Sequence, residues 1–394
     1  MRGGEMIHSG SPDVHTALKL LQDLADNQDT CSPRRVDKPL LLYGAGNLGL
    51  MAREFFDRLG IPFLYVVDSN PGKYAGSKAW NDVSILSPDD VSKEHRAGCL
   101  LAICIATCPY LSIADHLQTQ GWQDVVPFYD IAEAYNDRHP LSNGWFSGAL
   151  DRDDREGIKY ALMHWADDIS RAHHLQFIAW HKQRTEWTFH DAPVTTDDRF
   201  FIPPVLSSFR EGEVFVDGGA HHGEVSLRFM EIVHHKFAKV YAIEPDKHNI
   251  DVLRSNLSSD TGSPEGNIQI HECALGKRTM RSLFYHGLGY TSQFSSLARD
   301  WAPVKALDEM DIPASVIKFH LEGWEYDALL GSMNTLKTHR PTLAVTIYHN
   351  RDGLWKIPGL LMNNLQDYIY LLRLHSWVGT GCVVYAIPRE KFIQ

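Results

Sequence analysis

Residues 214–233 read VFVDGGAHHGEVSLRFMEIV, and this stretch decides the fold of the second half of the chain. A short apolar run meets an acid, Asp217, and then a loop with glycines at 218, 219 and 223. A helix-like stretch follows, and KVYAIEP at 239–245 is typical of the next strand, which ends at Glu244. Strand, glycine loop, helix and strand in this order predict a nucleotide-binding βαβ unit.

Two acids frame this unit, and their positions suit S-adenosylmethionine (SAM). Asp217 can face the cationic amino group of SAM, and Glu244 can accept hydrogen bonds from both ribose hydroxyls. SAM has no pyrophosphate, so the loop need only pack against the cofactor. The adenine ring is expected against the backbone of NIQIHECALG, at 267–276. The predicted cofactor-binding residues are Asp217, Gly218, Gly219, Ala220, Gly223, Glu244, Pro245, Cys273 and Ala274.

The remaining apolar runs fit one large sheet. RSLFYH (281–286) is expected to form a short strand, followed by strands in SVIKFH (315–320) and TLAVTIYH (342–349). DYIYLLRLH (367–375) and GCVVYAIP (381–388) are expected to form a final hairpin, which puts an antiparallel strand at the end of an otherwise parallel sheet. The prediction is a seven-stranded sheet of the class I SAM methyltransferase type.

A second glycine loop stands near the start of the chain, in PLLLYGAGNLG at 39–49. A strand leads into this loop, a helix follows as far as Gly60, and the strand PFLYVVD ends at Asp68. This is the layout of a dinucleotide-binding unit, whose glycines let the backbone approach a phosphate. Gly44, Gly46 and Asp68 are therefore candidate contacts for a nucleotide-like or phosphorylated ligand. The alternative is that the glycines only permit tight packing of strand against helix.

These patterns divide the chain into four parts. Residues 1–38 are expected to be helical or disordered, and 39–130 to form a small Rossmann-like domain. Residues 131–205 show no strand-like alternation and are expected to be a helical connector and linker. Residues 206–394 are expected to form the methyltransferase domain. The predicted fold class is α/β, with two Rossmann-like doubly wound domains.

The second half of the chain resembles the FkbM-type methyltransferase family. VFVDGGAHHGEVSLRF, VYAIEPD, ECALGKR, VKALDEM and VIKFHLEGWEYDALLG occur in that family's order and approximate spacing, between about Phe200 and Pro388. THRPTLAVTIYHNRDGLWKIP is similar to a subgroup that also carries an N-terminal YGAGN unit. The resemblance implies a SAM-dependent O-methyltransferase that acts on a sugar or polyketide hydroxyl. The family usually has an aspartate where His320 stands, and often Tyr-Asp where His221-His222 stand.

Methyl transfer to a hydroxyl needs a base that takes the proton, or a metal that lowers the pKa of the hydroxyl. His320 and His349 end two neighbouring strands, and Glu322 follows His320 by two residues. These three are the predicted catalytic residues. Metal-free base catalysis is preferred, and a divalent metal held by the three is the alternative. Acceptor contacts are expected from Tyr290, Ser292 and Tyr348.

Composition limits the partners. A formal net charge of −11 at pH 7 argues against nucleic-acid binding, and no apolar run approaches the roughly 20 residues that span a bilayer. The N-terminus shows no signal-peptide pattern, so a cytoplasmic protein is expected. The expected partner is a small-molecule or glycan acceptor. The N-terminal unit is expected to hold part of it, such as a nucleotide-linked sugar, or to mediate homo-oligomer formation.

Two other functions stay open at this point. One is an NAD-dependent sugar oxidoreductase or epimerase that uses the GAGNLG unit, although no catalytic Tyr-x-x-x-Lys helix follows that unit. The other is a non-catalytic or altered-activity binding or assembly protein on a methyltransferase fold. His320, in place of the family's aspartate, is the residue that favours this second alternative.

Overall fold

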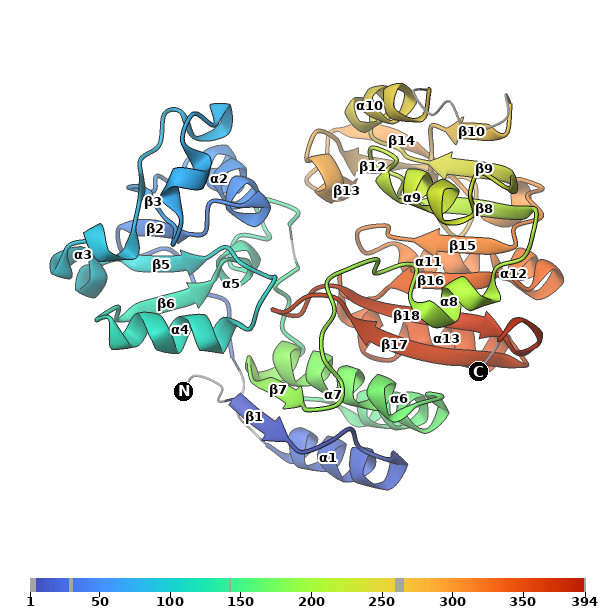
Figure 1. The fold of residues 1–394 in the computed structure, drawn as a ribbon, viewed down its shortest axis with the longest axis horizontal. Coiled ribbons are helices and arrows are strands. Elements are labelled where there is room, and N and C mark those ends of the chain that lie inside the picture. Colours follow the sequence, from blue (N-terminus) through green and yellow to red (C-terminus); the bar gives the residue numbers. More distant parts are fainter. Residues whose placement is uncertain (1–4, 28–30, 142, 259–265, 393–394) are drawn as a thin grey trace.

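The computed structural model describes residues 5–27, 31–141, 143–258 and 266–392. It contains two large open sheets, one from each half of the chain, and a group of helices that runs along one side of the molecule (Figure 1). Within these described ranges, no helix is long and apolar enough to cross a membrane.

The first sheet is built around the strand that leads into the N-terminal glycine loop. Its five strands are all parallel, in the order β4-β3-β2-β5-β6, so β2 is central. Helix α2 ends where Gly60 adopts a left-handed backbone with φ 66°, as the sequence predicts. The bounds are β2 Leu40–Tyr43, α2 Asn47–Leu59, β3 Val66–Val67, β4 Ile85–Leu86, α3 Lys93–Gly98, β5 Leu100–Ile103, α4 Tyr110–Thr119, β6 Asp124–Pro127 and α5 Phe128–Glu133.

The second sheet has seven strands in the order β10-β9-β8-β15-β16-β18-β17. Only β18 runs against the others, and it lies between β16 and β17 rather than at the edge. The final hairpin therefore places β17 outermost. The bounds are β8 Glu213–Gly218, α9 Glu224–Ile232, β9 Phe237–Ile243, α10 Lys247–Ser258, β10 Ile268–His271, β15 Val316–Phe319, α11 Glu325–Leu330, α12 Met333–His339, β16 Thr342–Thr346, α13 Lys356–Asn364, β17 Tyr368–Leu374 and β18 Cys382–Pro388.

A small sheet covers the outer end of the second half. It has the order β11-β14-β12-β13, and it contains the RSLFYH strand, which does not join the large sheet. Its strands are β11 Ala274–Leu275, β12 Met280–Tyr285, β13 Gln293–Phe294 and β14 Asp300–Lys305.

The predicted helical connector and linker, 131–205, also contains a strand that the sequence pattern does not predict. β7 (Glu186–Phe189) pairs in parallel with β1 (Glu5–His8), and the His8 ring stacks on Phe189 with centroids 4.5 Å apart. Four residues are too few to show a periodic pattern in the sequence. The helices of this layer are α1 Val14–Asp26, α6 Arg152–His164 and α7 Asp168–Gln183. Helix α8, Pro203–Ser208, instead packs against β18 of the second sheet (Figure 1).

The connector layer packs as part of the second half. Buried Leu21 of α1 and Leu175 of α7 belong to the same hydrophobic core as Leu372 of β17. Trp180 of α7 instead belongs to the core of the first sheet, where its ring packs against Tyr110 of α4. Helix α7 therefore contributes buried residues to the cores of both large sheets and connects the two halves of the molecule.

Candidate active site

A cavity of about 560 Å³ lies at the carboxyl ends of β8, β9 and β15. The strands β8, β9 and β15 are parallel, so these ends meet at one edge of the sheet, which is where ligands bind in open α/β sheets. Loop 287–292 and the small sheet close its far wall. The predicted cofactor-binding residues that line this cavity are Gly219, Glu244, Pro245, Cys273 and Ala274.

Glu244 follows the last residue of β9 and is 5% exposed. Its Oε2 accepts the backbone N–H of His221 at 2.9 Å, and its Oε1 accepts the N–H of Asp246 at 2.9 Å and the Asn249 amide at 3.3 Å. Burial raises the pKa of Glu244, against the opposing effect of these three donors. The contacts fix the carboxylate at the cavity wall, and because Oε1 already accepts two hydrogen bonds, the free lone pair for a ligand is on Oε2.

Asp217 is placed differently from Glu244. Its carboxylate is fully buried, with Lys318 Nζ 2.8 Å from Oδ1 and the Ser226 hydroxyl donating to Oδ2. Lys318 also donates to the Gly219 carbonyl at 2.7 Å. Asp217 is not among the residues that line the cavity. The pair therefore lies below the glycine loop and holds it in place, and a direct contact between Asp217 and a cofactor stays a prediction.

The glycine loop depends on the absence of side chains at two points. Gly219 has φ +73°, and a Cβ there would lie 2.0 Å from the backbone carbonyl oxygen of His320. Gly223 has φ +91°, and its Cβ would meet Leu253 at 2.8 Å. Gly218, Ala220 and Gly223 are outside the cavity lining, so their contribution is to the path of the loop.

Sequence reasoning missed several residues of this wall. Asn249 lies on α10 and bridges Glu244 and the Gly289 carbonyl, and Phe294 stacks on Trp324 with ring centroids 3.6 Å apart. All three line the cavity. The one available signal was Trp324, a large aromatic residue directly after the Glu322-Gly323 turn. Asn249 and Phe294 carry no pattern that sets them apart in the sequence.

Loop 287–292 is anchored from below by Asp246. The Asp246 carboxylate accepts the backbone N–H of Gly287 at 2.7 Å and the hydroxyl of Ser292. The Ser292 hydroxyl is thus used within the protein, while the side chain still lines the cavity. Tyr290 lines this cavity and a second one beside it. Partial burial raises the pKa of Tyr290, although the residue is 48% exposed.

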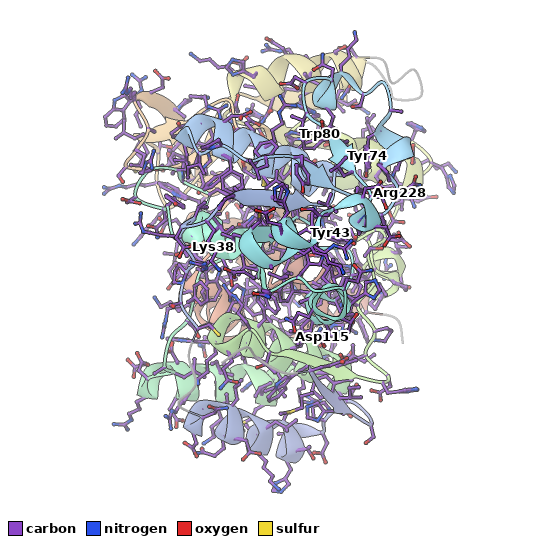
Figure 2. All side chains as sticks on the ribbon, turned by 90° about the vertical axis from the view of Figure 1, so that its left-hand side faces the viewer. Lys38, Tyr43, Tyr74, Trp80, Asp115 and Arg228 are labelled. Carbon is purple, nitrogen blue, oxygen red and sulfur yellow. The ribbon has the colours of Figure 1, made fainter. Side chains whose placement is uncertain are left out.

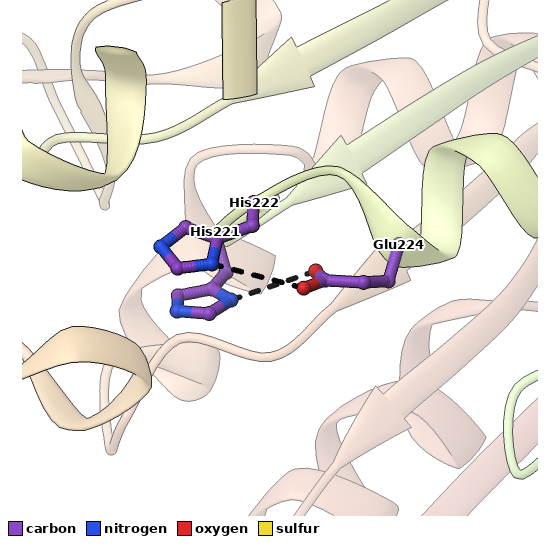
Figure 3. Close-up of side chains that lie close together, drawn as sticks. All are labelled: His221, His222 and Glu224. Atoms are coloured by element: carbon purple, nitrogen blue, oxygen red, sulfur yellow. Dashed lines mark ion pairs between the residues drawn. The ribbon is translucent and has the colours of Figure 1, made fainter. Parts of the chain in front are cut away.

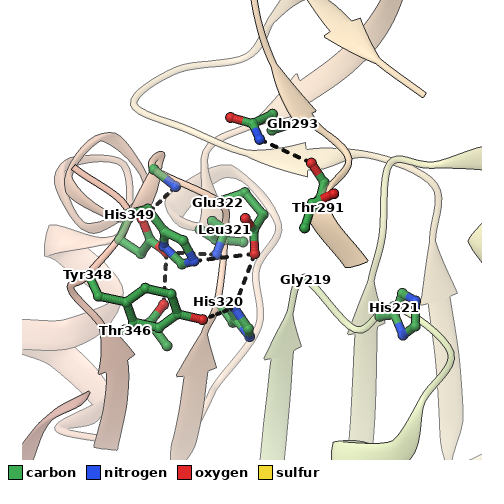
Figure 4. Close-up of polar contacts among 12 residues, drawn as sticks. Gly219, His221, Thr291, Gln293, His320, Leu321, Glu322, Thr346, Tyr348 and His349 are labelled. Carbon is green, nitrogen blue, oxygen red and sulfur yellow. Dashed lines mark hydrogen bonds and ion pairs between the residues drawn. The ribbon is translucent and has the colours of Figure 1, made fainter. Parts of the chain in front are cut away.

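The three predicted catalytic residues lie together, as Figure 4 shows. Glu322 Oε1 lies 3.1 Å from His320 Nε2 and 3.2 Å from His349 Nε2. Glu322 has φ +49°, which is uncommon for a residue with a side chain, and this backbone directs the carboxylate back toward β15 and β16. The hydroxyl of Tyr348 is 3.0 Å from His320 Nε2.

A fourth residue, Glu325, completes this cluster and was not anticipated. Its Oε1 lies 2.7 Å from His349 Nδ1 and accepts the Thr346 hydroxyl at 2.8 Å and the Leu321 N–H at 2.9 Å. Its Oε2 accepts the Gly323 N–H at 3.0 Å. Glu325 is the first residue of α11 and is 1% exposed. Acidic residues are common in the first turn of a helix, so its position in the sequence did not indicate that it is buried.

Charges in the cluster are strongly coupled. Burial lowers the pKa of His320 to about 4. Burial also opposes protonation of His349, but Glu322 and Glu325 outweigh it and hold the pKa of His349 well above its usual value. Burial alone would raise the pKa of both glutamates, yet the neighbouring imidazoles, His349 foremost, lower them below the usual range. A cationic His349 therefore lies between two carboxylates, beside a neutral His320.

A second group of histidines lies at the edge of the cavity. The stacked rings of His221 and His222 are 3.5 and 3.8 Å from the carboxylate of Glu224 at the start of α9 (Figure 3). The Glu224 side chain is 64% exposed, and His221 also lines the cavity. This group is open to solvent, in contrast to the buried cluster around Glu322.

The second cavity, of about 480 Å³, meets the first at Tyr290, His320 and Glu322. It receives Tyr129 from α5 of the first half and Tyr348 from the second half. Most of its walls are hydroxyl, amide or charged side chains. Its remaining lining residues are Asn143, Arg199, Thr291, Ser376, Thr380 and Gly381.

The residues predicted at the N-terminal glycine loop line neither cavity; they are Gly44, Gly46 and Asp68. Asp68 Oδ2 accepts the N–H of Ala45 at 2.8 Å, so this carboxylate provides the hydrogen-bond acceptor for a backbone N–H of the loop. A Cβ on Gly49 would lie 2.1 Å from the Gly44 carbonyl, which favours close packing as the reason for that glycine. Figure 2 shows Tyr43, Tyr74 and Trp80 in this half of the molecule. Ligand binding by this loop stays a prediction.

Comparison with known proteins supports a methyltransferase. Residues 217–372 match the family model described as Methyltransferase FkbM domain. The matched segment is less than half of the chain and contains the glycine loop, Glu244 and the His320 cluster. No curated protein matches the sequence.

Solved structures show the fold. The crystal structure of methyltransferase FkbM from Methylobacillus flagellatus KT is similar with a TM-score of 0.60 at 18% identity, over 94% of this chain and 98% of that one. Precorrin-6y C5,15-methyltransferase from Geobacter metallireducens GS-15 has a TM-score of 0.30 at 13% identity, over 49% and 91% of the two chains. The SAH-bound Podospora anserina methyltransferase PaMTH1 has a TM-score of 0.28 at 10% identity, over 67% and 98%. The first likeness shows an α/β methyltransferase-like fold.

Proposed function

We propose that this protein is a SAM-dependent O-methyltransferase whose acceptor is a hydroxyl of a sugar or glycan, including nucleotide-linked sugars. One observation supports this most strongly. The cavity that carries Glu244 meets a second, polar cavity, and His320 and Glu322 belong to both walls. A methyl donor in the first cavity and a hydroxyl in the second would meet at these two side chains.

The first cavity fits SAM by the chemistry of its donors. Glu244 is a fixed carboxylate, and its Oε2 can accept a hydrogen bond from a ribose hydroxyl. Cys273, Ala274 and Pro245 also line this cavity, and an adenine ring would lie against them. SAM supplies an electrophilic methyl group. The chain itself supplies orientation through the residues that line the cavity.

The reaction is a base-assisted in-line displacement. The acceptor O–H bond breaks and its proton passes to the His320 cluster, while the oxygen forms a bond to the methyl carbon and the carbon–sulfur bond of SAM breaks. S-adenosylhomocysteine leaves with the bonding electrons on sulfur. In the ion-free chain, His320 is the proton acceptor, Glu322 orients its ring, and His349 and Glu325 hold Glu322 in place.

The second cavity suits a polyhydroxylated acceptor. Tyrosine, serine and threonine hydroxyls, the Asn143 amide and the Arg199 guanidinium line it, and these groups recognise sugar hydroxyls or a nucleotide phosphate. Tyr129 comes from the 39–130 unit and Asn143 from the connector, so both would contribute to acceptor binding. On this basis we propose that 39–130 is an acceptor-completing domain and 206–394 the methyltransferase domain.

Calorimetry with SAM tests the proposal. Wild-type protein is expected to bind SAM, and Glu244→Ala to weaken binding at least tenfold. Glu272→Ala is the matched control, because Glu272 is exposed and pairs with Arg254 outside the cavity. Transfer of a labelled methyl group is then measured on a panel of sugars, glycans and nucleotide sugars. Absence of SAM binding by the wild-type protein would refute the proposal.

A further inference from the structure

Three ligand-type atoms converge where the two cavities meet. They are Nε2 of His320, Oε1 of Glu322 and Nε2 of His349, and all lie within 4.8 Å of one another. The two nitrogen–oxygen separations are 3.1 and 3.2 Å. Ligand atoms bound about 2.0–2.2 Å from one ion at tetrahedral or octahedral angles lie about 3.0–3.5 Å apart. The observed spacing therefore matches one shared ion.

The ring of His349 is the independent observation that points to a ligand. His349 is 4% exposed, and its Nε2 makes no hydrogen bond of good geometry, although Oε1 of Glu322 lies 3.2 Å away. A buried polar atom without a satisfactory partner is costly and calls for an explanation. Because Nε2 of His349 faces Glu322 and His320, a bound cation would satisfy all three atoms together (Figure 4).

Glu325 gives His349 the support that metal-binding histidines usually have. A histidine ligand commonly directs its other ring nitrogen toward a carboxylate, which fixes the tautomer and leaves Nε2 for the metal. Glu325 Oε1 lies 2.7 Å from Nδ1 of His349. Thr346 and two backbone N–H groups hold this carboxylate in turn. Glu325 is thus a positioning residue for His349.

We propose that His320, Glu322 and His349 bind a divalent first-row transition-metal ion. Two imidazoles and one carboxylate suit zinc, cobalt, manganese or iron better than magnesium or calcium, which prefer oxygen ligands. The three ligands leave open positions toward the second cavity, which His320 and Glu322 line. The Tyr348 hydroxyl, 3.0 Å from His320 Nε2, borders that open side.

The role of the ion deepens the proposed function and rests on it. An acceptor hydroxyl bound to the ion loses its proton to solvent water more readily, and its oxygen then attacks the methyl carbon as the carbon–sulfur bond breaks. With the ion bound, His320 cannot accept the acceptor proton, because its Nε2 then binds the ion. The ion instead promotes the loss of that proton. Binding of the ion itself requires neither SAM nor an acceptor.

Metal binding is measured directly on the full chain. The protein is stripped with a chelator, dialysed, and titrated with Co²⁺ while the visible ligand-field absorption is followed. Zn²⁺ retention after dialysis is measured by elemental analysis. About one ion per chain is expected. Glu322→Gln and His349→Gln are expected to weaken binding at least 100-fold, and Glu325→Gln about 10- to 100-fold.

Two further variants keep the test decisive. His222→Gln is the matched control, since it removes an imidazole from the exposed His221–His222–Glu224 group, and it should leave Co²⁺ affinity unchanged. His320→Asp exchanges a nitrogen ligand for oxygen, so it should retain cobalt with a shifted spectrum. SAM titration on each variant reports whether the chain is folded and whether the first cavity is intact.

The outcomes separate this inference from the proposed function. Binding that is lost in Glu322→Gln and His349→Gln but kept in His222→Gln supports the site. No cobalt spectrum and no retained zinc in wild-type protein would overturn it, as would binding that is lost only in His222→Gln. SAM binding without ion binding would overturn the metal site and leave the methyltransferase proposal intact. Ion binding without SAM binding would support the metal site and refute the methyltransferase proposal.

Discussion

Nδ1 of His349 lies 2.7 Å from Oε1 of Glu325, and both side chains are at least 97% buried. His349 follows β16 and Glu325 begins α11, so the contact joins the end of a strand to the start of the helix that follows the neighbouring strand. It sets the orientation of His349 and through it the position of Glu322. The chemistry proposed at His320 depends on this contact.

Replacing Glu325 with Gln should slow methyl transfer about 10- to 100-fold while leaving SAM affinity within about twofold. Gln keeps only one acceptor oxygen, so the N–H of either Leu321 or Gly323 loses its acceptor, and the neutral amide no longer attracts a cationic His349. Thr346→Val, which removes one donor to the same carboxylate, should cost less than tenfold. Turnover and SAM affinity are measured side by side. Equal losses in both quantities would mean that Glu325 only stabilises the fold.

His320→Ala should lower turnover about 10²- to 10³-fold, since the group that receives or directs the acceptor proton is removed. The side chain lies at the junction of the cavities, so SAM affinity should change little. His320→Asp replaces the imidazole with a carboxylate, which can also accept a proton, and should give intermediate activity. Turnover above wild type in His320→Asp would show that the histidine is a departure from function.

The sequence predicted the large sheet and the position of His320, Glu322 and His349 because strand ends and glycine loops are local patterns. Parallel strands bring such ends together in any α/β sheet. Lys318 and Glu325 could not be assigned in the same way, because their burial depends on partners about 100 and 24 residues away. The second cavity was also out of reach, since Tyr129 and Arg199 meet Tyr348 only through long-range packing.

The salt bridge between Lys318 and Asp217 should carry much of the stability of the glycine loop. Both side chains are at most 3% exposed, so Lys318→Met leaves a buried carboxylate without its cation. The expected loss is about 3–5 kcal/mol in the free energy of unfolding, together with weaker SAM binding. Urea unfolding measures the first quantity.

Two comparisons control this measurement. The double variant Lys318→Met, Asp217→Asn should recover part of the loss, because no unpaired charge stays buried. Arg254→Met breaks the exposed pair with Glu272 and should cost less than about 1 kcal/mol. If Lys318→Met were as mild as Arg254→Met, the buried pair would not hold the loop.

Glu186 should make the stability of the protein depend on pH. Its carboxylate accepts the backbone N–H groups of Tyr110 and Leu111 at the start of α4, yet burial raises its pKa to about 7. The folded state therefore binds a proton more tightly than the unfolded chain, whose pKa is near 4.5. The stability that comes from this tighter proton binding at Glu186 is fully present below pH 4.5 and is lost as the pH rises through 7.

Glu186→Gln removes the titration, so the stability difference between variant and wild type should change by up to about 3 kcal/mol between pH 5 and pH 8, in favour of the variant at pH 8. Thermal unfolding of both proteins at several pH values measures this difference. Glu272→Gln, at an exposed position, should show a nearly constant difference over the same range. A constant difference for Glu186→Gln as well would mean that Glu186 is ionised throughout, held by the two N–H donors of α4 despite its burial.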